Sequence, residues 1–263
     1  MRRPCIADLT LGTALLLAAA GVAAAQTNTG TMSPLEKAVA CAPPPSFDGP
    51  PPRPLHILGS QDTVQRALLG PRDLLVVDGG TEAGVQLGQQ FFVRRMNTFG
   101  MARGTRAAGT TTAGWISIVA VNGSTAIASV DHACGALLEM DFLVPFVAPV
   151  VPAGADRDET PGQPDFMSLG RIVFMGGGER VATAPGEFVL IDQGSDQGVI
   201  PGARFALYRD VGTSGYGGVR AHGVPLASVG EAIVISTGAS MSLTRITRAR
   251  DAVYGGDYVA PRK

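Results

Sequence analysis

The fold is decided by the stretch Asp73-Leu-Leu-Val-Val-Asp-Gly-Gly-Thr-Glu-Ala-Gly-Val-Gln-Leu-Gly-Gln-Gln-Phe-Phe-Val-Arg-Arg95, because the chain carries a second copy of it. That copy, Glu187-Phe-Val-Leu-Ile-Asp-Gln-Gly-Ser-Asp-Gln-Gly-Val-Ile-Pro-Gly-Ala-Arg-Phe-Ala-Leu-Tyr-Arg209, aligns without a gap at a spacing of 114. A further block, 114–145, aligns with 230–261 at a spacing of 116. A repeat of this length indicates one structural unit used twice. The identical pairs are Asp78/Asp192, Gly80/Gly194, Gly84/Gly198, Val85/Val199, Gly88/Gly202, Phe91/Phe205, Arg95/Arg209, Gly114/Gly230, Ser124/Ser240, Ala133/Ala249, Ala136/Ala252, Asp141/Asp257 and Pro145/Pro261.

Short runs of β-branched and aromatic residues between turn residues predict an all-β fold in both copies. Five or six strands in about 90 residues, with no sustained helical period, favour a small antiparallel barrel that protects its edges. A pair of sandwiches is the alternative. We therefore expect two tandem small antiparallel β-barrel-like repeats. The expected strands are 55–58, 74–77, 91–95, 115–121, 125–130 and 142–144, then 171–174, 188–191, 204–209, 232–236, 241–246 and 258–260.

Residues 1–25 have the form of a secretory signal peptide. Arg2 and Arg3 supply the positive charge, residues 9–22 the apolar run, and Ala23-Ala24-Ala25 the small-residue cleavage site. The apolar run is shorter than the roughly 20 residues that a bilayer-spanning helix needs. We therefore expect cleavage after Ala25, no stable membrane insertion afterwards, and a periplasmic or secreted location.

The chain that remains after this cleavage is nearly neutral. Loss of Arg2, Arg3 and Asp8 from 21 basic and 22 acidic residues leaves 19 and 21, a net charge of −2. Such a balance offers no general attraction for nucleic acid or anionic lipid. We expect no nucleic-acid partner.

Two Pro-rich stretches divide the chain. Ser33-Pro34-Leu35-Glu36 predicts a capped helix that ends near Cys41. Residues 43–54 hold seven prolines, which is typical of an extended connector, and a second stretch at 149–165 separates the repeats. The expected organisation is a signal peptide at 1–25, a short helix and Pro-rich tail at 26–53, β repeat 1 at 54–147, a Pro/Gly-rich linker at 148–167 and β repeat 2 at 168–263.

Two cysteines follow the signal peptide. Cys41 lies in the tail, and Cys134 lies in the first repeat, where the second repeat has Arg250. An even pair in an oxidising compartment predicts a Cys41–Cys134 disulfide that joins the tail to the first barrel. Two unpaired thiols are the alternative.

The motif Asp-x-Gly-[Ser/Thr]-[Glu/Asp]-x-Gly-Val-x-x-Gly occurs at 78–88 and again at 192–202. It predicts a turn between strands in which the aspartate accepts hydrogen bonds from turn amides. Val85 and Val199 would close the end of each barrel. A calcium loop is the alternative, but the spacing is not that of an EF-hand and the terminal bidentate glutamate is missing. We expect no metal site.

Catalytic constellations are weak in this sequence. Its three histidines, His56, His132 and His222, do not stand at metal-ligand spacings. His132 and Cys134 could imitate a thiol–imidazole pair. Asp141 and Asp257 could form a carboxylate pair split between the repeats, although one turn used twice explains them more simply. We expect no cofactor.

The two copies differ most after the strands that contain Phe91 and Phe205. We expect long Gly-rich loops at 96–113 and 210–229, and long loops on a rigid barrel are where binding is usually placed. A solvated hairpin tip is the alternative, and Trp115, the only tryptophan, is interpreted as core rather than ligand platform. Arg94 and Arg95 add basic character before the first loop. The candidate binding residues are Arg103, Arg106, Tyr216 and Arg220.

The repeated string Asp-x-Gly-x-x-x-Gly-Val-x-x-Gly-x-x-Phe-x-[Val/Leu]-x-Arg, a long loop, Gly-x-x-x-[Ile/Val] and then Gly-Asp-Tyr-Val resembles repeats of bacterial envelope proteins. Such repeats follow LysM peptidoglycan-binding modules and are similar to the C-terminal domain of flagellar assembly protein T. Residues 73–146 and 187–262 carry the resemblance; the first copy departs from it at Glu139-Met140-Asp141, where the second has Gly255-Gly256-Asp257. The resemblance implies an extracytoplasmic, non-catalytic β-module and transfers no catalytic residue.

The leading hypothesis is an exported structural or interaction module of the cell envelope that binds an envelope protein or peptidoglycan. A periplasmic hydrolase with an interdomain Asp/His site and a soluble-ligand carrier are the alternatives. The features that only one copy has, namely Cys134, Trp115 and the basic segment around Arg103, are where we expect specific function.

Overall fold

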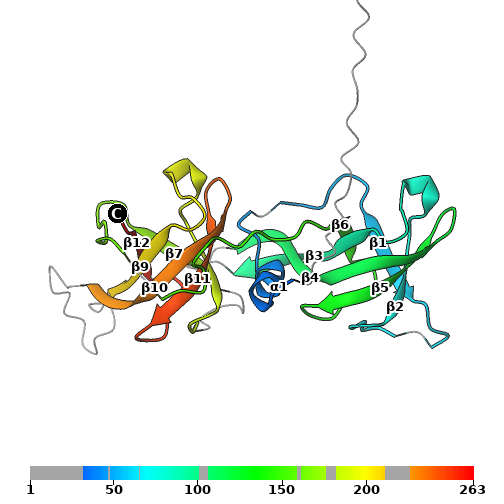
Figure 1. The fold of residues 1–263 in the computed structure, drawn as a ribbon, viewed down its shortest axis with the longest axis horizontal. Helices are drawn as coiled ribbons and strands as arrows, with labels where there is room; N and C mark the ends of the chain where they lie inside the picture. The colour runs from blue at the N-terminus through cyan, green and yellow to red at the C-terminus, as the bar shows by residue number, and fades with distance from the viewer. Residues whose placement is uncertain are drawn as a thin grey trace, which may run out of the picture.

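The computed structural model describes residues 32–46, 48–64, 66–100, 106–158, 161–175, 182–210 and 226–263. The predicted signal peptide lies outside these residues. The chain forms two closed antiparallel barrels that lie side by side, with one short helix between them (Figure 1). The all-β prediction with two tandem barrels is therefore confirmed, and the sandwich alternative is wrong.

Barrel 1 closes in the order β1-β2-β5-β4-β3-β6, and barrel 2 closes in the equivalent order β7-β8-β11-β10-β9-β12. Each predicted strand coincides with an observed one. In barrel 1 these are β1 (Leu55–Ser60), β2 (Leu74–Val77), β3 (Gln90–Gly100), β4 (Arg106–Val121), β5 (Ala126–Ala133) and β6 (Phe142–Pro145). In barrel 2 they are β7 (Gly170–Met175), β8 (Phe188–Ile191), β9 (Arg204–Asp210), β10 (Leu226–Thr237), β11 (Ser242–Ala249) and β12 (Tyr258–Pro261).

Each barrel is filled by the inward-facing side chains of its own strands. Period-2 alternation sends Ile57, Leu75 and Ile116 into barrel 1, and Ile172, Val189 and Leu207 into barrel 2. Val85 and Val199 lie buried in these two cores, as the repeated motif predicts. The interiors are therefore packed cores and not ligand cavities.

The repeated motif forms a short 3-10 turn in both barrels, η1 (Thr81–Ala83) and η3 (Ser195–Gln197). The amides of Thr81 and Glu82 donate to the carbonyls of Asn122 and Gly123 in the β4–β5 turn at 2.9 and 3.0 Å, and η3 makes the same contacts in barrel 2. A Cβ on Gly80 would overlap these carbonyl oxygens. The motif glycine is thus required by a close backbone approach.

The long loop predicted at 96–113 is wrong in its larger part. β3 continues to Gly100 and β4 starts at Arg106, and the ladder between them runs to the pair Gly100↔Arg106. This hairpin extends beyond the wall of barrel 1, so the interior of that barrel imposes no apolar alternation on it. Its threonines have strand propensity but lack the apolar period on which the prediction depended.

Candidate functional site

The features that distinguish the first repeat from the second meet at the junction between the barrels. Cys134, Trp115 and the β3–β4 hairpin all contact either helix α1 (Pro34–Cys41) or barrel 2. The junction is therefore the best-defined specific feature of the described chain.

Helix α1 forms here because its sequence fixes both ends. The Ser33 hydroxyl accepts a hydrogen bond from the Glu36 amide, and the Glu36 carboxylate accepts one from the Ser33 amide, with Pro34 at the first helical turn. Hydrogen bonding of the Glu36 carboxylate by the Ser33 backbone amide and, secondly, by the Ser33 side chain lowers the pKa of Glu36. Eight residues are too few for a helix that is stable alone, so packing against both barrels stabilises α1.

A disulfide joins α1 to barrel 1. Cys41 and Cys134 are bonded, with their Cα atoms 5.4 Å apart, which is a normal separation for a disulfide. The predicted pairing is thus present, and the alternative of two unpaired thiols does not hold. His132 lies close to both sulfurs, but sulfurs in a disulfide are not thiolates and cannot act as nucleophile or metal ligand.

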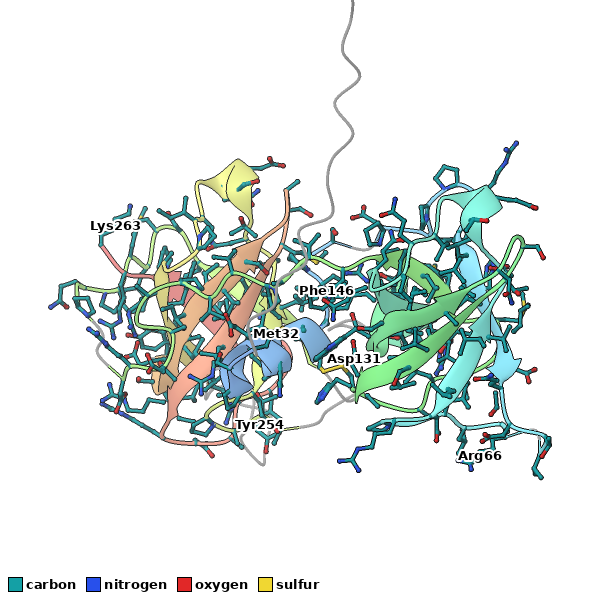
Figure 2. All side chains as sticks on the ribbon, turned by 45° about the vertical axis from the view of Figure 1, so that its right-hand side comes forward. Met32, Arg66, Asp131, Phe146, Tyr254 and Lys263 are labelled. Carbon is teal, nitrogen blue, oxygen red and sulfur yellow. A yellow bond between two sulfur atoms is a disulfide. The ribbon has the colours of Figure 1, made fainter. Side chains whose placement is uncertain are left out.

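Beside the disulfide, α1 rests on an aromatic cluster of barrel 1. Ala40 packs with Phe92 and Trp115, and Met32 and Phe146 border the same cluster (Figure 2). Trp115 is 4% exposed and stacks on His132 with ring centroids 4.4 Å apart. Trp115 is therefore buried, as predicted, although it lies on the outside of the barrel wall beneath a helix.

The opposite side of α1 faces the outer wall of barrel 2. Leu35 and Val39 pack in one cluster with Leu190, Ile235 and Leu243. Phe99, near the end of the β3–β4 hairpin, belongs to the same cluster and is 7% exposed. Barrel 1 thus contacts barrel 2 both directly and through α1.

The segment between the repeats is bound to barrel 2 and is not a loose connector. The Arg204 guanidinium donates to the carbonyl of Gly154 at 3.0 Å, and that of Arg245 donates to the carbonyl of Ala155 at 2.8 Å. Ala155 is buried in the cluster that contains Phe99. The linker therefore adds to the junction.

The candidate binding residues fall into two groups. Arg103, Tyr216 and Arg220 lie outside the described residues, as does His222. Arg106 opens β4 opposite Gly100 and is exposed, one position from the pair that contains Phe99. Arg106 is therefore the first residue of a strand in the hairpin.

The two basic residues before this hairpin have other roles. Arg94 lies over the Phe92 ring at 5.6 Å, and burial lowers the pKa of its guanidinium. Arg95 is held by Asp141, whose hydrogen bonds raise the pKa of Arg95. Arg95 is thus occupied within its own barrel.

Asp141 and Asp257 have the same structural role in the two barrels. Asp141 accepts two hydrogen bonds from Arg95 at 2.7 Å and one from the Leu138 amide. Asp257 accepts the equivalent bonds from Arg209 and from the Tyr254 amide. Each carboxylate is bound within its own barrel, as expected for one turn used twice.

Asp78 and Asp192 accept backbone hydrogen bonds, but from a different place than predicted. Their Oδ1 atoms accept from the amides of His56 and Arg171, at the starts of β1 and β7. The donors therefore belong to β1 and β7 and not to the turn. Each aspartate directly follows β2 or β8, and these strands pair with β1 and β7. His56 Nδ1 also lies 3.2 Å from Asp78 Oδ2.

A small pocket of about 360 Å³ opens at the Arg209–Asp257 pair in barrel 2. Arg171 lines it, but its guanidinium stacks on Tyr258 and donates to the Tyr258 hydroxyl and the Gly256 carbonyl. Because both arginines of this pocket are already hydrogen-bonded to the protein, the pocket does not provide a free anion site.

One surface was missed at the level of the sequence. Leu58 and Val119, on the outer wall of barrel 1, are 48% and 45% exposed and lie on either side of the outward-facing Val76 and Ile127. Their counterparts in barrel 2 lie under α1. No signal in the sequence marks this difference, because these outward-facing positions are aliphatic in both repeats.

No known protein family matches this sequence, and no curated protein does. Within the described residues, no helix has the length and apolar character required to span a membrane. The fold and junction define the class of protein: a tandem β-barrel protein whose barrels are joined by a disulfide-linked helix.

Proposed function

We propose that this chain is an exported, non-catalytic structural or interaction module of the bacterial cell envelope that binds an envelope protein or peptidoglycan. The observation that carries the proposal is how the polar residues of the repeats are used. Arg95 and Asp141, present in both copies, hold a turn, and Cys134, present in one copy, joins α1 to barrel 1 at the junction. Because the junction holds the two barrels together, the protein presents the outer surfaces of the two barrels at a fixed separation.

Export is supported by two independent features. The N-terminal 25 residues have the signal-peptide pattern, and the Cys41–Cys134 disulfide suits an oxidising compartment. The resemblance of the repeats to envelope modules supports the same location.

The location is tested with a C-terminal reporter enzyme that is active only outside the cytoplasm. The full chain is expected to give an active reporter, and a chain without residues 1–25 an inactive one. Equal activity of both fusions would contradict export.

Envelope binding is tested by co-sedimentation of the purified, oxidised protein with isolated peptidoglycan, and by photo-crosslinking from surface positions in intact cells. Retention by peptidoglycan, or one reproducible crosslinked envelope protein, supports the proposal. Absence of both would contradict it. A hydrolase would instead release soluble fragments from the peptidoglycan, which the same samples report.

A further inference from the structure

The outer wall of barrel 1 carries an apolar strip, which we call strip 1 and define as the exposed Leu58 and Val119 and the half-buried Val76 and Ile127 between them. Val76 and Ile127 are direct cross-strand partners on β2 and β5. Leu58 lies in the β1 bulge beside Val76, and Val119 lies in the β4 bulge beside Ile127. The strip therefore crosses four adjacent strands without a charged side chain.

The same strip exists in barrel 2, where it is covered. Strip 2 consists of Val173, Leu190, Ile235 and Leu243, with Leu190 paired to Leu243 and the other two in the equivalent bulges. Leu190, Ile235 and Leu243 are at most 2% exposed, because the residues of α1 and Phe99 pack on them. The same outer wall is thus covered by a helix in barrel 2 and uncovered in barrel 1.

We propose that strip 1 binds an amphipathic helix of a partner protein in the envelope, in the way that strip 2 binds α1. The side chains that α1 places toward strip 2 are Leu35 and Val39, at i and i+4, so the partner helix should carry aliphatic residues at this spacing. This inference rests on the proposed function and selects a protein partner over peptidoglycan, because peptidoglycan glycan strands offer no such aliphatic side chains.

The border of strip 1 adds a charge preference. Ser117 stands where barrel 2 has Ile233, and its hydroxyl donates to Asp131, which also accepts from Gln90. Among the described residues no cation pairs with Asp131. A basic residue beside the aliphatic pair of the partner helix would complement this carboxylate.

A second copy of the chain fits strip 1 less well. The wall of barrel 1 beneath α1 presents Trp115 and Phe146, whereas the corresponding positions of barrel 2 are Glu231 and Arg262, which are ion-paired at 2.6 Å. Barrel 2 therefore lacks the apolar wall with which barrel 1 and α1 approach strip 2, and it cannot repeat that arrangement on the next molecule.

The probe is a fluorescent peptide of residues 32–42, held helical by a lactam between Lys37 and a Cys41→Asp substitution. This bridge lies on the side of the helix away from Leu35 and Val39. Fluorescence anisotropy measures its binding to the oxidised full chain. We expect saturable binding that Leu58→Asp or Val119→Asp weakens at least tenfold. Leu87→Asp, at an exposed apolar residue outside the strip, is the matched control and should change binding less than twofold.

Two further measurements do not depend on those variants. Hydrogen exchange of the unsubstituted chain with bound peptide should slow in β2 and β5 and not in β8 and β11. A peptide with Ala38→Lys should bind several-fold tighter than its parent to the unsubstituted chain, and this gain should disappear with Asp131→Asn.

Three outcomes of the peptide experiments would overturn the inference: no binding, binding that both strip variants leave unchanged, or protection of β8 and β11 by displacement of α1. Sedimentation of the chain alone as a dimer that Val119→Asp dissociates would assign strip 1 to a second copy and also overturn it. None of these results alters the reporter or peptidoglycan experiments, so failure here is distinguishable from failure of the proposed function.

Discussion

The guanidinium of Arg95 holds the carboxylate of Asp141 through two hydrogen bonds of 2.7 Å. The arginine comes from β3, and the aspartate ends the turn before β6, so the pair fixes the turn that delivers the last strand of barrel 1 to its neighbour. Arg209 and Asp257 repeat this arrangement in barrel 2. The side chains are unequally buried: that of Arg95 is 33% exposed and that of Asp141 only 2%.

This inequality predicts that the two partners are not equally costly to remove. Arg95→Met leaves a buried carboxylate without its cation and should lower the free energy of unfolding by about 3–5 kcal/mol. Asp141→Asn leaves a guanidinium that water still reaches and should cost about 1–3 kcal/mol. Urea denaturation followed by circular dichroism measures both, and Arg209→Met and Asp257→Asn should show the same order. Equal losses at Arg95 and Asp141 would contradict this account.

The same pair changes how a catalytic test is interpreted. Loss of any activity in Asp141→Asn does not by itself indicate a catalytic carboxylate, because the substitution weakens the turn before β6. Activity assays on this variant are therefore made well below its unfolding temperature.

The turns before β6 and β12 differ in one residue that has a left-handed backbone. Met140 has φ 66°, and its counterpart Gly256 has φ 92°. A non-glycine residue pays about 1–2 kcal/mol in this region, and glycine loses about 0.5–1 kcal/mol through its greater freedom when unfolded. Met140→Gly should therefore stabilise barrel 1 by about 0.5–1 kcal/mol. Thermal unfolding measures the change.

Gly256→Ala is the reciprocal test. A Cβ on Gly256 has no heavy atom within 4 Å, so the substitution probes backbone conformation without a steric clash. It should destabilise barrel 2. Stabilisation by Gly256→Ala, or destabilisation by Met140→Gly, would show that the turn tolerates a side chain better than its dihedral angle indicates.

The disulfide should contribute to stability through the unfolded chain as well as through α1. Cys41 and Cys134 are 93 residues apart in sequence, and closing so long a loop typically stabilises a protein by about 2–4 kcal/mol. Cys41→Ser with Cys134→Ser should lose this amount and expose residues 43–54 to protease. Non-reducing mass spectrometry of the unsubstituted protein should show no thiol at either position; two thiols there would refute the linkage.

Phe99 should couple the two barrels. Its ring is 7% exposed in the cluster on barrel 2, and burial of such a side chain contributes about 1.5–3 kcal/mol. Phe99→Ala should separate the calorimetric unfolding of the two barrels into two transitions. Met96→Ala, on the same hairpin but 42% exposed, should leave the profile unchanged. An unchanged profile in both variants would mean that Phe99 does not couple the barrels.

The strands could be predicted because inward-facing apolar residues alternate along them, and each barrel is built from the strands of a single repeat. The junction could not be predicted, because an apolar residue in a strand can belong either to the barrel interior or to a covered outer wall. Trp115 and Phe92 look like interior residues although they lie on the outer wall, and a capping box such as that of Ser33 says where a helix begins but not what it packs against. The docking of the linker through Arg204 and Arg245 depends on single long-range contacts to backbone carbonyls, which have no local signature.

The two repeats also carry different information. Shared residues such as Gly80 and Asp141 identified turns, and the structure confirms that use. Specific function was expected among the features found in one copy, and two of these, Cys134 and Trp115, contact helix α1 at the junction. Strip 1 was overlooked because isolated apolar residues on a strand do not reveal whether their face is covered.

The position of Trp115 also gives this molecule an optical reporter. It is the only tryptophan of the chain. It lies in the cluster that includes Ala40 of α1 and the two disulfide-bonded cysteines, Cys41 and Cys134. Its emission therefore senses departure of the helix and quenching by the adjacent sulfurs, whereas barrel 2, which has no tryptophan, stays dark at this wavelength. Tryptophan emission can thus time the release of the helix in unlabelled protein, without a direct contribution from barrel 2.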